Sequence, residues 1–263
     1  MNRLYLIPDS TDMERIDPLA REYGCSFEYN DFYTPSVLDD PGKQEEIIER
    51  YAKYRSDFSN DTMHGAFLDI TIHSSDPLIR EASILRIRQS MDIAKRMGLK
   101  GVVFHTGRLA GFRVEFYLNQ WLRMNRDFFQ ELAAEYPKQQ IYMENMFDEA
   151  PDIMASLAGQ MKGTDSFGIC LDYAHAALTA TPPQEWLETL APYVHHMHIN
   201  DNDLQNDLHQ PVGTGRIDWQ LFDQLIRNHH IDATVLIEVN GYEAQKASLE
   251  YMKQHLLYPM DTY

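Results

Sequence analysis

The chain has little cysteine and no long hydrophobic run, and both shortages exclude whole classes of protein. Only Cys25 and Cys170 occur among its 263 residues, which is too few for a disulfide framework. No segment approaches the roughly 18 to 20 consecutive apolar residues of a membrane span, and Asp9 interrupts the first hydrophobic stretch before a signal-peptide core could form. We therefore expect a cytoplasmic protein without a membrane partner.

Basic residues are also scarce. Lysine and arginine total 23 against 40 aspartates and glutamates, so the formal net charge at pH 7 is -17. This charge disfavours non-specific binding to nucleic acid, although bound divalent metals or a local basic face would offset it, and a nucleic-acid partner therefore stays open. The composition, 44% hydrophobic and 24% charged, is typical of a folded chain with a sizeable core, and a homo-oligomer is compatible with it.

Short strand-like runs alternate with longer helical runs along the whole chain. The predicted strands cover residues 4–7, 26–29, 62–64, 101–105, 141–144, 167–172, 194–199 and 234–238. The predicted helices cover residues 13–23, 43–58, 77–98, 114–136, a segment that begins at 151, 183–190, 219–228 and 242–256. Eight such pairs match the size and order of an α/β fold, a single (β/α)8 TIM barrel domain over residues 1–263.

A doubly wound open sheet is the competing architecture. Such a sheet usually carries a glycine-rich phosphate-binding turn after an early strand. The segment LIPDST, which follows the first predicted strand, contains no glycine. We therefore place the closed barrel first and the open sheet second.

Ionisable residues stand at the ends of six predicted strands. They are His64, His105, Glu144, Asp172, His198 and Glu238. The carboxyl ends of barrel strands meet at one mouth, so these side chains are expected to crowd there. Because side chains alternate along a strand, a second set of residues should share this inward face deeper in the barrel: Val103, Tyr142, Cys170, His196 and Leu236. Apolar residues between them, such as Phe104 and Met143, should face the surrounding helices. Crowded carboxylates are costly to bury unless a cation lies among them.

Two loops add further candidate ligands. His175 follows the sixth predicted strand closely, and the segment after the seventh contains Asp201, Asp203, Asp207 and His209. Mixed imidazole and carboxylate donors fit zinc, manganese, cobalt or iron better than calcium or magnesium. A single histidine at a strand end is more often a hydrogen-bonded rim residue, so the prediction of a metal site depends on the whole set.

Substrate contacts are predicted from residues near the mouth. Arg108 and Arg216 could clamp a phosphate or carboxylate, although surface arginines are commoner than clamps. Phe67 is expected to wall the mouth or simply to pack.

Several motifs resemble one known group. The strings HGAFLD, VVFHTG, YMEN, GICLDYAHA, HMHINDND, DLHQPVGTGRIDW and VLIEVN look like the xylose isomerase-like TIM barrel superfamily, over residues 64–238. This superfamily holds sugar isomerases and epimerases together with the endonuclease IV group, AP endonuclease family 2. The resemblance to sugar epimerases implies one divalent ion bound by Glu144, Asp172, His198 and Glu238. The resemblance to endonuclease IV implies three zinc ions, held by His64, His105 and Glu144, by Glu144, Asp172, His198 and Glu238, and by His175, Asp207 and His209.

The first functional hypothesis is isomerisation or epimerisation of a small sugar, sugar phosphate or sugar acid through a metal-stabilised enediolate. The cofactor would be one to three zinc or manganese ions. Glu144 and Glu238 would act as acid and base, as the resemblance implies, and His175 would steer a substrate oxygen.

Two alternatives remain. An endonuclease IV-like enzyme would hydrolyse a phosphodiester at abasic DNA sites with clustered zinc ions. The acidic loop NDFYTPSVLDDPG, which has no basic residue before Lys43, is unlike the basic loops that such a nuclease inserts into DNA. A barrel that keeps an ion but serves only as a binding module is the non-enzymatic alternative.

Overall fold

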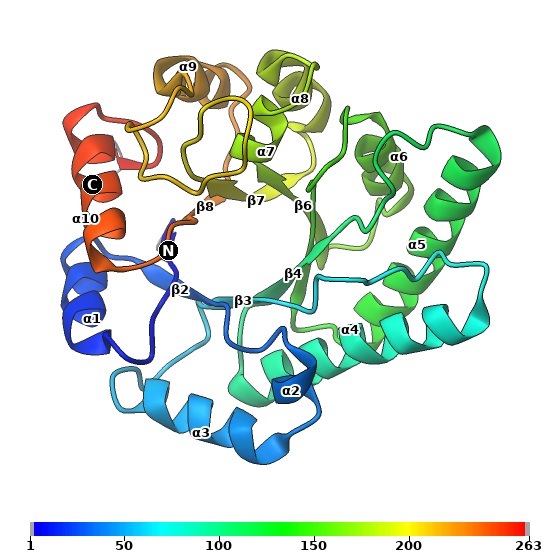
Figure 1. Ribbon diagram of the computed structural model, residues 1–263, viewed down its shortest axis with the longest axis horizontal. Helices are drawn as coiled ribbons and strands as arrows, with labels where there is room; N and C mark the ends of the chain where they lie inside the picture. The colour runs from blue at the N-terminus through cyan, green and yellow to red at the C-terminus, as the bar shows by residue number, and fades with distance from the viewer. Residues whose placement is uncertain (1–2, 261–263) are drawn as a thin grey trace.

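The computed structural model describes residues 3–260, which form a closed parallel barrel surrounded by helices (Figure 1). The strands are β1 (Leu4–Leu6), β2 (Ser26–Tyr29), β3 (Thr62–His64), β4 (Gly101–His105), β5 (Gln140–Glu144), β6 (Phe167–Asp172), β7 (Val194–Ile199) and β8 (Thr234–Ile237). Each strand pairs in parallel with the next, and β1 pairs with β8 to close the barrel. The predicted (β/α)8 fold is therefore confirmed. Residues 1–2 and 261–263 of the predicted domain lie outside the described residues.

The helices follow the strands in the expected order. They are α1 (Met13–Glu22), α2 (Pro35–Leu38), α3 (Pro41–Ala52), α4 (Pro77–Met97), α5 (Glu115–Glu135), α6 (Asp152–Gln160), α7 (Tyr173–Ala177), α8 (Pro183–Leu190), α9 (Trp219–Asn228) and α10 (Tyr242–Gln254). The sequence does not predict α2 and α7, because four and five residues are too few for a helical period to be recognised. The helix predicted over residues 43–58 ends at Ala52 instead, and Glu238 lies just beyond β8.

The long helix α4 illustrates how local sequence sets an element. The Asp76 carboxylate accepts a hydrogen bond from the backbone N–H of Leu78, and Pro77 occupies the first helical position. Gly98 ends the helix in the left-handed conformation, with φ 73, where a side chain would be strained. The chain then enters β4 at Gly101, three residues after this cap.

The barrel is buried on both faces, as the alternation in the strands predicts. Outward side chains such as Phe104, Met143 and Met197 belong to the main hydrophobic core between strands and helices. Inward side chains form two separate small clusters inside the barrel, one of Tyr5, Ile7 and Leu236 and one of Val103, Tyr142 and Cys170. This packing leaves mainly the strand ends to carry polar chemistry.

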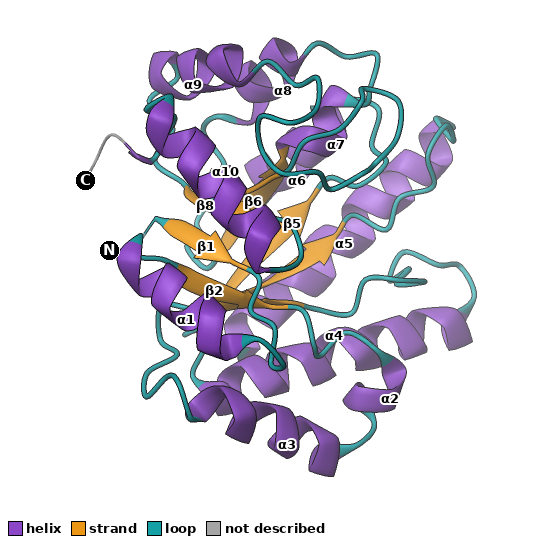
Figure 2. Ribbon diagram, turned by 60° about the vertical axis from the view of Figure 1, so that its left-hand side comes forward, coloured by secondary structure: helices purple, strands orange, loops and turns teal. Residues whose placement is uncertain are grey.

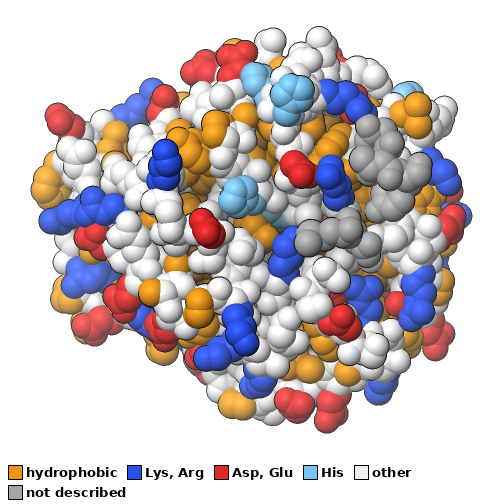
Figure 3. All heavy atoms as spheres, turned by 180° about the vertical axis from the view of Figure 1, so that it is seen from behind, with side chains coloured by type: hydrophobic (Ala, Val, Ile, Leu, Met, Phe, Trp, Pro, Cys, Tyr) orange, Lys and Arg blue, Asp and Glu red, His pale blue; other side chains and the backbone are white. Residues whose placement is uncertain are grey.

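The two ends of the barrel differ in their loops. Figure 2 shows the strand arrows pointing toward one side, where long loops gather, including the segment between β7 and α9. Figure 3 shows the opposite face, where acidic and basic side chains are scattered among hydrophobic ones. No helix within residues 3–260 has the length and apolar character needed to cross a membrane.

Candidate metal centre

Four buried residues at the ends of β5 to β8 bring their donor atoms together. We call Glu144, Asp172, His198 and Glu238 the strand-end cluster; one ligand atom from each lies within 4.8 Å of the others. Three of these side chains are no more than 1% exposed, and Glu238 is 12% exposed. Two carboxylate oxygens, Asp172 Oδ2 and Glu238 Oε2, are buried without a hydrogen-bond partner among the described residues. Buried carboxylate oxygens need a partner, and a divalent cation fits this donor set.

The strand ladder and one asparagine fix Asp172 in place. The backbone N–H of Asp172 donates to Asn145 Oδ1 at 2.9 Å, and Asn145 Nδ2 donates to the Asp172 carbonyl at 2.9 Å. Asp172 also caps α7, because its Oδ1 accepts the backbone N–H of His175 at 2.6 Å. One carboxylate oxygen is therefore used locally, and the other stays free for an ion.

Two further groups flank the strand-end cluster. The first, which we call the rim pair, consists of His64 and His105. The Nε2 atom of each imidazole lies 3.2 Å from Glu144 Oε2. The loop cluster consists of His175, Asp207 and His209, and both imidazole Nε2 atoms lie 3.3 Å from Asp207 carboxylate oxygens. The structure thus brings together the three residue groups that the resemblance to endonuclease IV implies.

The segment between β7 and α9 is folded around a buried carboxylate. Asp201 accepts hydrogen bonds from the backbone N–H groups of Gly213 and Ile217 and from the indole of Trp219. A Cβ atom at Gly215 would lie only 2.3 Å from Asp201 Oδ1, so the run GTG needs glycine there. Asp201 is therefore satisfied by this loop, which presents the loop cluster to the mouth.

Several imidazoles have oxygen acceptors at both ring nitrogens. His175 Nδ1 lies 3.0 Å from the Asn145 carbonyl, and His209 Nδ1 lies 2.9 Å from the Glu238 carbonyl, while both Nε2 atoms face Asp207. His64 is placed similarly, between the Gly65 carbonyl and Glu144. Each of these rings is either doubly protonated or binds a cation in place of one proton.

The close approach of these ionisable groups also shifts the pKa values of Glu144 and Glu238 in opposite directions. Burial alone would raise the pKa of Glu144, but the adjacent His198 and His105 hold it well below its usual range. Burial, together with the charges of Glu144 and Asp172 and against that of His198, raises the pKa of Glu238 to about 7. The pKa of His198 is raised well above its ordinary value because the surrounding carboxylates outweigh its burial. The cluster is therefore a region of strong negative potential.

A pocket of about 440 Å³ opens above these groups. Its lining residues are Ile7, Asn30, Tyr33, His64, Phe67, His105, Met146, His175, Asp207, His209, Glu238 and Asn240. The ring of Phe67 lies 5.2 Å from the ring of His64 and 5.3 Å from that of His105, so Phe67 walls the mouth. No sequence pattern selects Tyr33, Asn30 or Asn240, which come from loops whose course depends on the fold.

The two predicted arginine anchors do not line this pocket. Arg108 is 5% exposed, and its Nε donates to Asp148 at 2.8 Å, so its guanidinium is already paired. Arg216 is an exposed residue of the β7–α9 loop, outside the pocket lining. Sequence alone could not show that Arg108 is buried against a carboxylate 40 positions away.

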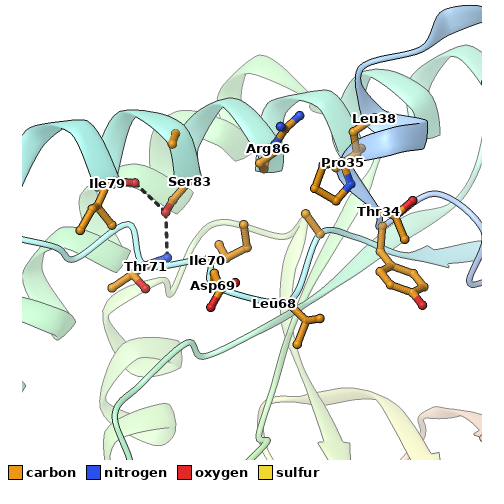
Figure 4. Close-up of a pocket in the computed structure, with 13 residues that line it drawn as sticks. Thr34, Pro35, Leu38, Leu68, Asp69, Ile70, Thr71, Ile79, Ser83 and Arg86 are labelled. Carbon is orange, nitrogen blue, oxygen red and sulfur yellow. Dashed lines mark hydrogen bonds between the residues drawn. The ribbon is translucent and has the colours of Figure 1, made fainter.

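A more apolar groove lies elsewhere, between α2, α4 and the segment after β3. Figure 4 shows Leu68, Ile70 and Ile79 along this groove, which has a volume of about 660 Å³. Its charged lining residues are Arg86, which is paired with Asp39, and the exposed Asp69. The groove therefore lacks the convergent imidazoles and carboxylates of the mouth.

Comparison with known proteins agrees with this architecture. A family model described as xylose isomerase-like TIM barrel matches residues 19–255. The uncharacterized protein MJ1311 of Methanocaldococcus jannaschii is 26% identical over 203 residues, which cover 74% of this chain and 69% of that protein. The TTHB071 protein from Thermus thermophilus, solved after soaking with ZnCl2, matches with a TM-score of 0.76 and 24% identity over 96% of this chain and 97% of that one. A D-tagatose 3-epimerase-like protein matches with a TM-score of 0.77 and 21% identity over 97% of each chain. At these identities the two structures show a shared fold.

Proposed function

Because the chain belongs to the xylose isomerase-like TIM barrel family, we propose that it is a divalent-metal-dependent isomerase or epimerase of a small sugar, sugar phosphate or sugar acid. The observation that carries this proposal is the strand-end cluster itself, in which three carboxylates and one imidazole are buried together and two carboxylate oxygens lack a hydrogen-bond partner among the described residues. The pKa of Glu144 is lowered and that of Glu238 is raised to about 7. Environments that push two titratable groups apart are typical of an acid and base pair.

The metal requirement follows from the donor chemistry of the strand-end cluster. Glu144, Asp172, His198 and Glu238 would hold the ion, and the unpartnered oxygens of Asp172 and Glu238 support this assignment. When bound, a divalent cation supplies electrostatic stabilisation for negative charge that develops on substrate oxygens. Zinc and manganese both fit the mixed carboxylate and imidazole set.

The side chains of the protein would then transfer the protons, orient the substrate and form the walls of the pocket. Glu144, at the end of β5, is suited to removing a proton from substrate carbon, and Glu238, just beyond the non-adjacent strand β8, is suited to returning one. His175 lines the pocket and would orient a substrate oxygen. The pocket volume of about 440 Å³ suits a small molecule, and Phe67 and Tyr33 provide apolar walls for its carbon skeleton.

Exchange of substrate C–H with solvent deuterium tests this function directly. A panel of aldoses, ketoses, sugar phosphates and sugar acids is incubated with metal-loaded protein in D2O and read by NMR. We expect incorporation of deuterium for at least one class, and Glu144→Gln should slow it by about 100-fold or more. Glu131→Gln, an exposed change on α5, is the matched control and should leave the rate unchanged. Exchange at the wild-type rate in Glu144→Gln would remove this residue from the mechanism.

A second candidate, hydrolysis of a phosphodiester at abasic DNA sites, is favoured by one observation. The rim pair and the loop cluster lie beside the strand-end cluster, which is the arrangement that three zinc ions would need. Against it, the net charge is -17, and Arg113 near the mouth is paired with Glu149. Zinc-loaded protein that nicks an abasic duplex, and shows no deuterium exchange with any sugar, would make this candidate the function.

A further inference from the structure

We propose that Glu28, on β2, is a positioning residue that holds His198 in the form in which its Nδ1 binds the metal. The proposal rests on the metal dependence of the proposed function but not on the identity of the substrate. Glu28 lies outside the strand-end cluster and does not line the mouth pocket. Glu28 contacts Nε2 of the His198 ring, whereas the strand-end cluster lies at Nδ1.

Glu28 is a carboxylate buried inside the barrel, with a relative exposure of 0%. Its Oε1 lies 3.0 Å from His198 Nε2, close enough for an ion pair, although the two atoms are not aligned for a hydrogen bond. Its Oε2 accepts a hydrogen bond from Thr62 Oγ1 at 2.7 Å and lies 3.2 Å from His196 Nε2. Within residues 3–260, its ion-pair partners are these two imidazoles, and neither a lysine nor an arginine pairs with it.

The His198 ring spans the space between Glu28 and the metal cluster. Its Nδ1 lies 3.0 Å from Glu144 Oε1 and 3.7 Å from Glu238 Oε2, on the side opposite the contact with Glu28. The negative charge of Glu28 beside Nε2 favours a proton on that nitrogen, and Nδ1, which faces the cluster, would then be the nitrogen that binds the ion. A carboxylate behind a metal-binding histidine fixes both the tautomer and the orientation of the ring, and it strengthens the nitrogen as a ligand.

A structural role alone does not account for a carboxylate at this position. A buried charge without a cationic lysine or arginine carries a large desolvation cost, whereas a neutral amide or an apolar residue would fill the barrel at lower cost. The neighbouring His196 is already anchored through Nδ1, 2.6 Å from Thr234 Oγ1. The charge of Glu28 is therefore best explained by its effect on His198.

Metal affinity of Glu28 variants tests the proposal. Zn2+ dissociation constants are measured by competition with a chromophoric chelator, without any substrate. Glu28→Leu removes both the acceptor and the charge and should weaken binding by about 10- to 100-fold. Glu28→Gln keeps an acceptor and should weaken binding less. Two matched controls remove buried polar groups on the helices outside the barrel: Ser90→Ala takes away the acceptor of the Ala66 N–H, and Asn125→Leu takes away a hydrogen bond to the Trp121 carbonyl.

The controls should bind Zn2+ nearly as tightly as the wild type. Equal affinity in Glu28→Leu and the wild type would overturn the proposal while leaving the proposed function untouched. If sugars fail to react but Glu28→Leu still loses affinity, the positioning role stands and the function is wrong.

A measurement on the wild type covers the case in which Glu28 variants do not fold. Long-range 1H–15N spectra of histidine-labelled protein report which ring nitrogen carries a proton. In the zinc-loaded protein we expect His198 to carry its proton on Nε2 and to show the shift of a metal-bound nitrogen at Nδ1. A proton on Nδ1, or zinc bound through Nε2, would contradict the proposal.

Discussion

The strand-end cluster and the loop cluster consist of the same residue types but differ in the burial of their side chains and in how their carboxylates are paired. Side chains of the strand-end cluster are at most 12% exposed, and two of its carboxylate oxygens have no hydrogen-bond partner among the described residues. In the loop cluster, Asp207 and His209 are 28% and 33% exposed, and Asp207 contacts both imidazoles. The difference teaches that deep burial and unpartnered carboxylate oxygens, and not residue type, distinguish the strand-end cluster as the site that the proposed cation would occupy.

The largest expected effect is a loss of metal affinity when the strand-end cluster is mutated, compared with the same mutation in the loop cluster. Asp172→Asn removes a buried anionic ligand and should weaken the tightest metal site by more than about 100-fold, beyond the effect usual for outer residues of a metal site. Asp207→Asn, a change of the same size in the loop cluster, should leave that site within about tenfold of wild type. Calorimetric titration with Zn2+ measures both. Similar losses in the two variants would mean that the clusters form one cooperative site.

Metal removal should lower the stability of the wild type but not of Asp172→Asn. An ion present at 100 times its dissociation constant stabilises a folded chain by about 2.7 kcal/mol. For a chain of this length that corresponds to roughly 5–10 °C in melting temperature. Thermal melts with and without chelator provide the comparison. Equal shifts in wild type and Asp172→Asn would place the stabilising ion elsewhere.

The pH dependence of the metal-free protein should distinguish the clusters further. The pKa of His209 is raised from 6.5 to about 9 by Asp207 and Glu238, although burial opposes this, so its stabilising contribution is complete below pH 6.5 and is lost as pH rises through 9. The pKa of Glu238 is raised from 4.5 to about 7, so ionisation of Glu238 destabilises the fold increasingly as pH rises from 4.5 through 7.

In chelated protein, Glu238 should therefore lower the melting temperature as the pH rises from 4.5 to 7, and His209 should lower it as the pH rises from 6.5 to 9. His209→Gln should flatten the decline above pH 6.5, and Glu238→Gln should flatten the decline below pH 7. Saturating Zn2+ should reduce both declines, because the ion replaces the protons. Identical pH profiles of melting temperature in the chelated wild type and in both variants would contradict the assigned shifts.

The smallest effect on stability and on metal affinity is expected for Arg216, an exposed residue of the segment between β7 and α9. Arg216→Ala should change the free energy of unfolding by no more than about 0.5 kcal/mol, as is usual for surface positions. It should also leave the Zn2+ affinity of the strand-end cluster unchanged. Denaturant unfolding and the same calorimetric titration measure the two quantities. A marked loss of affinity would show that the loop cluster and the strand-end cluster are coupled through the loop backbone.

The sequence predicted the barrel because eight strand-like runs alternate with eight helical runs, some of which, such as α4, carry a capping residue. The polar ends of several strands could also be recognised, since Glu144 and Asp172 each close a short apolar run and His198 precedes the last residue of its strand. These features are local in the chain, and the barrel then brings them to one mouth.

What the sequence could not predict depends on contacts between distant segments. Glu28 lies in a four-residue strand, and its importance appears only when His198, 170 positions later in the chain, is packed against it. The pairing of Arg108 with Asp148 likewise depends on two loops meeting across neighbouring strands. Neither contact leaves a periodic pattern in the sequence.

The most direct test of the central claim is the number and location of tightly bound ions in purified protein. Elemental analysis after dialysis against trace Zn2+ should give at least one ion per chain in the wild type and in Asp207→Asn, and none in Asp172→Asn. A wild-type chain that retains no ion, or an Asp172→Asn chain that retains its full complement, would contradict the account.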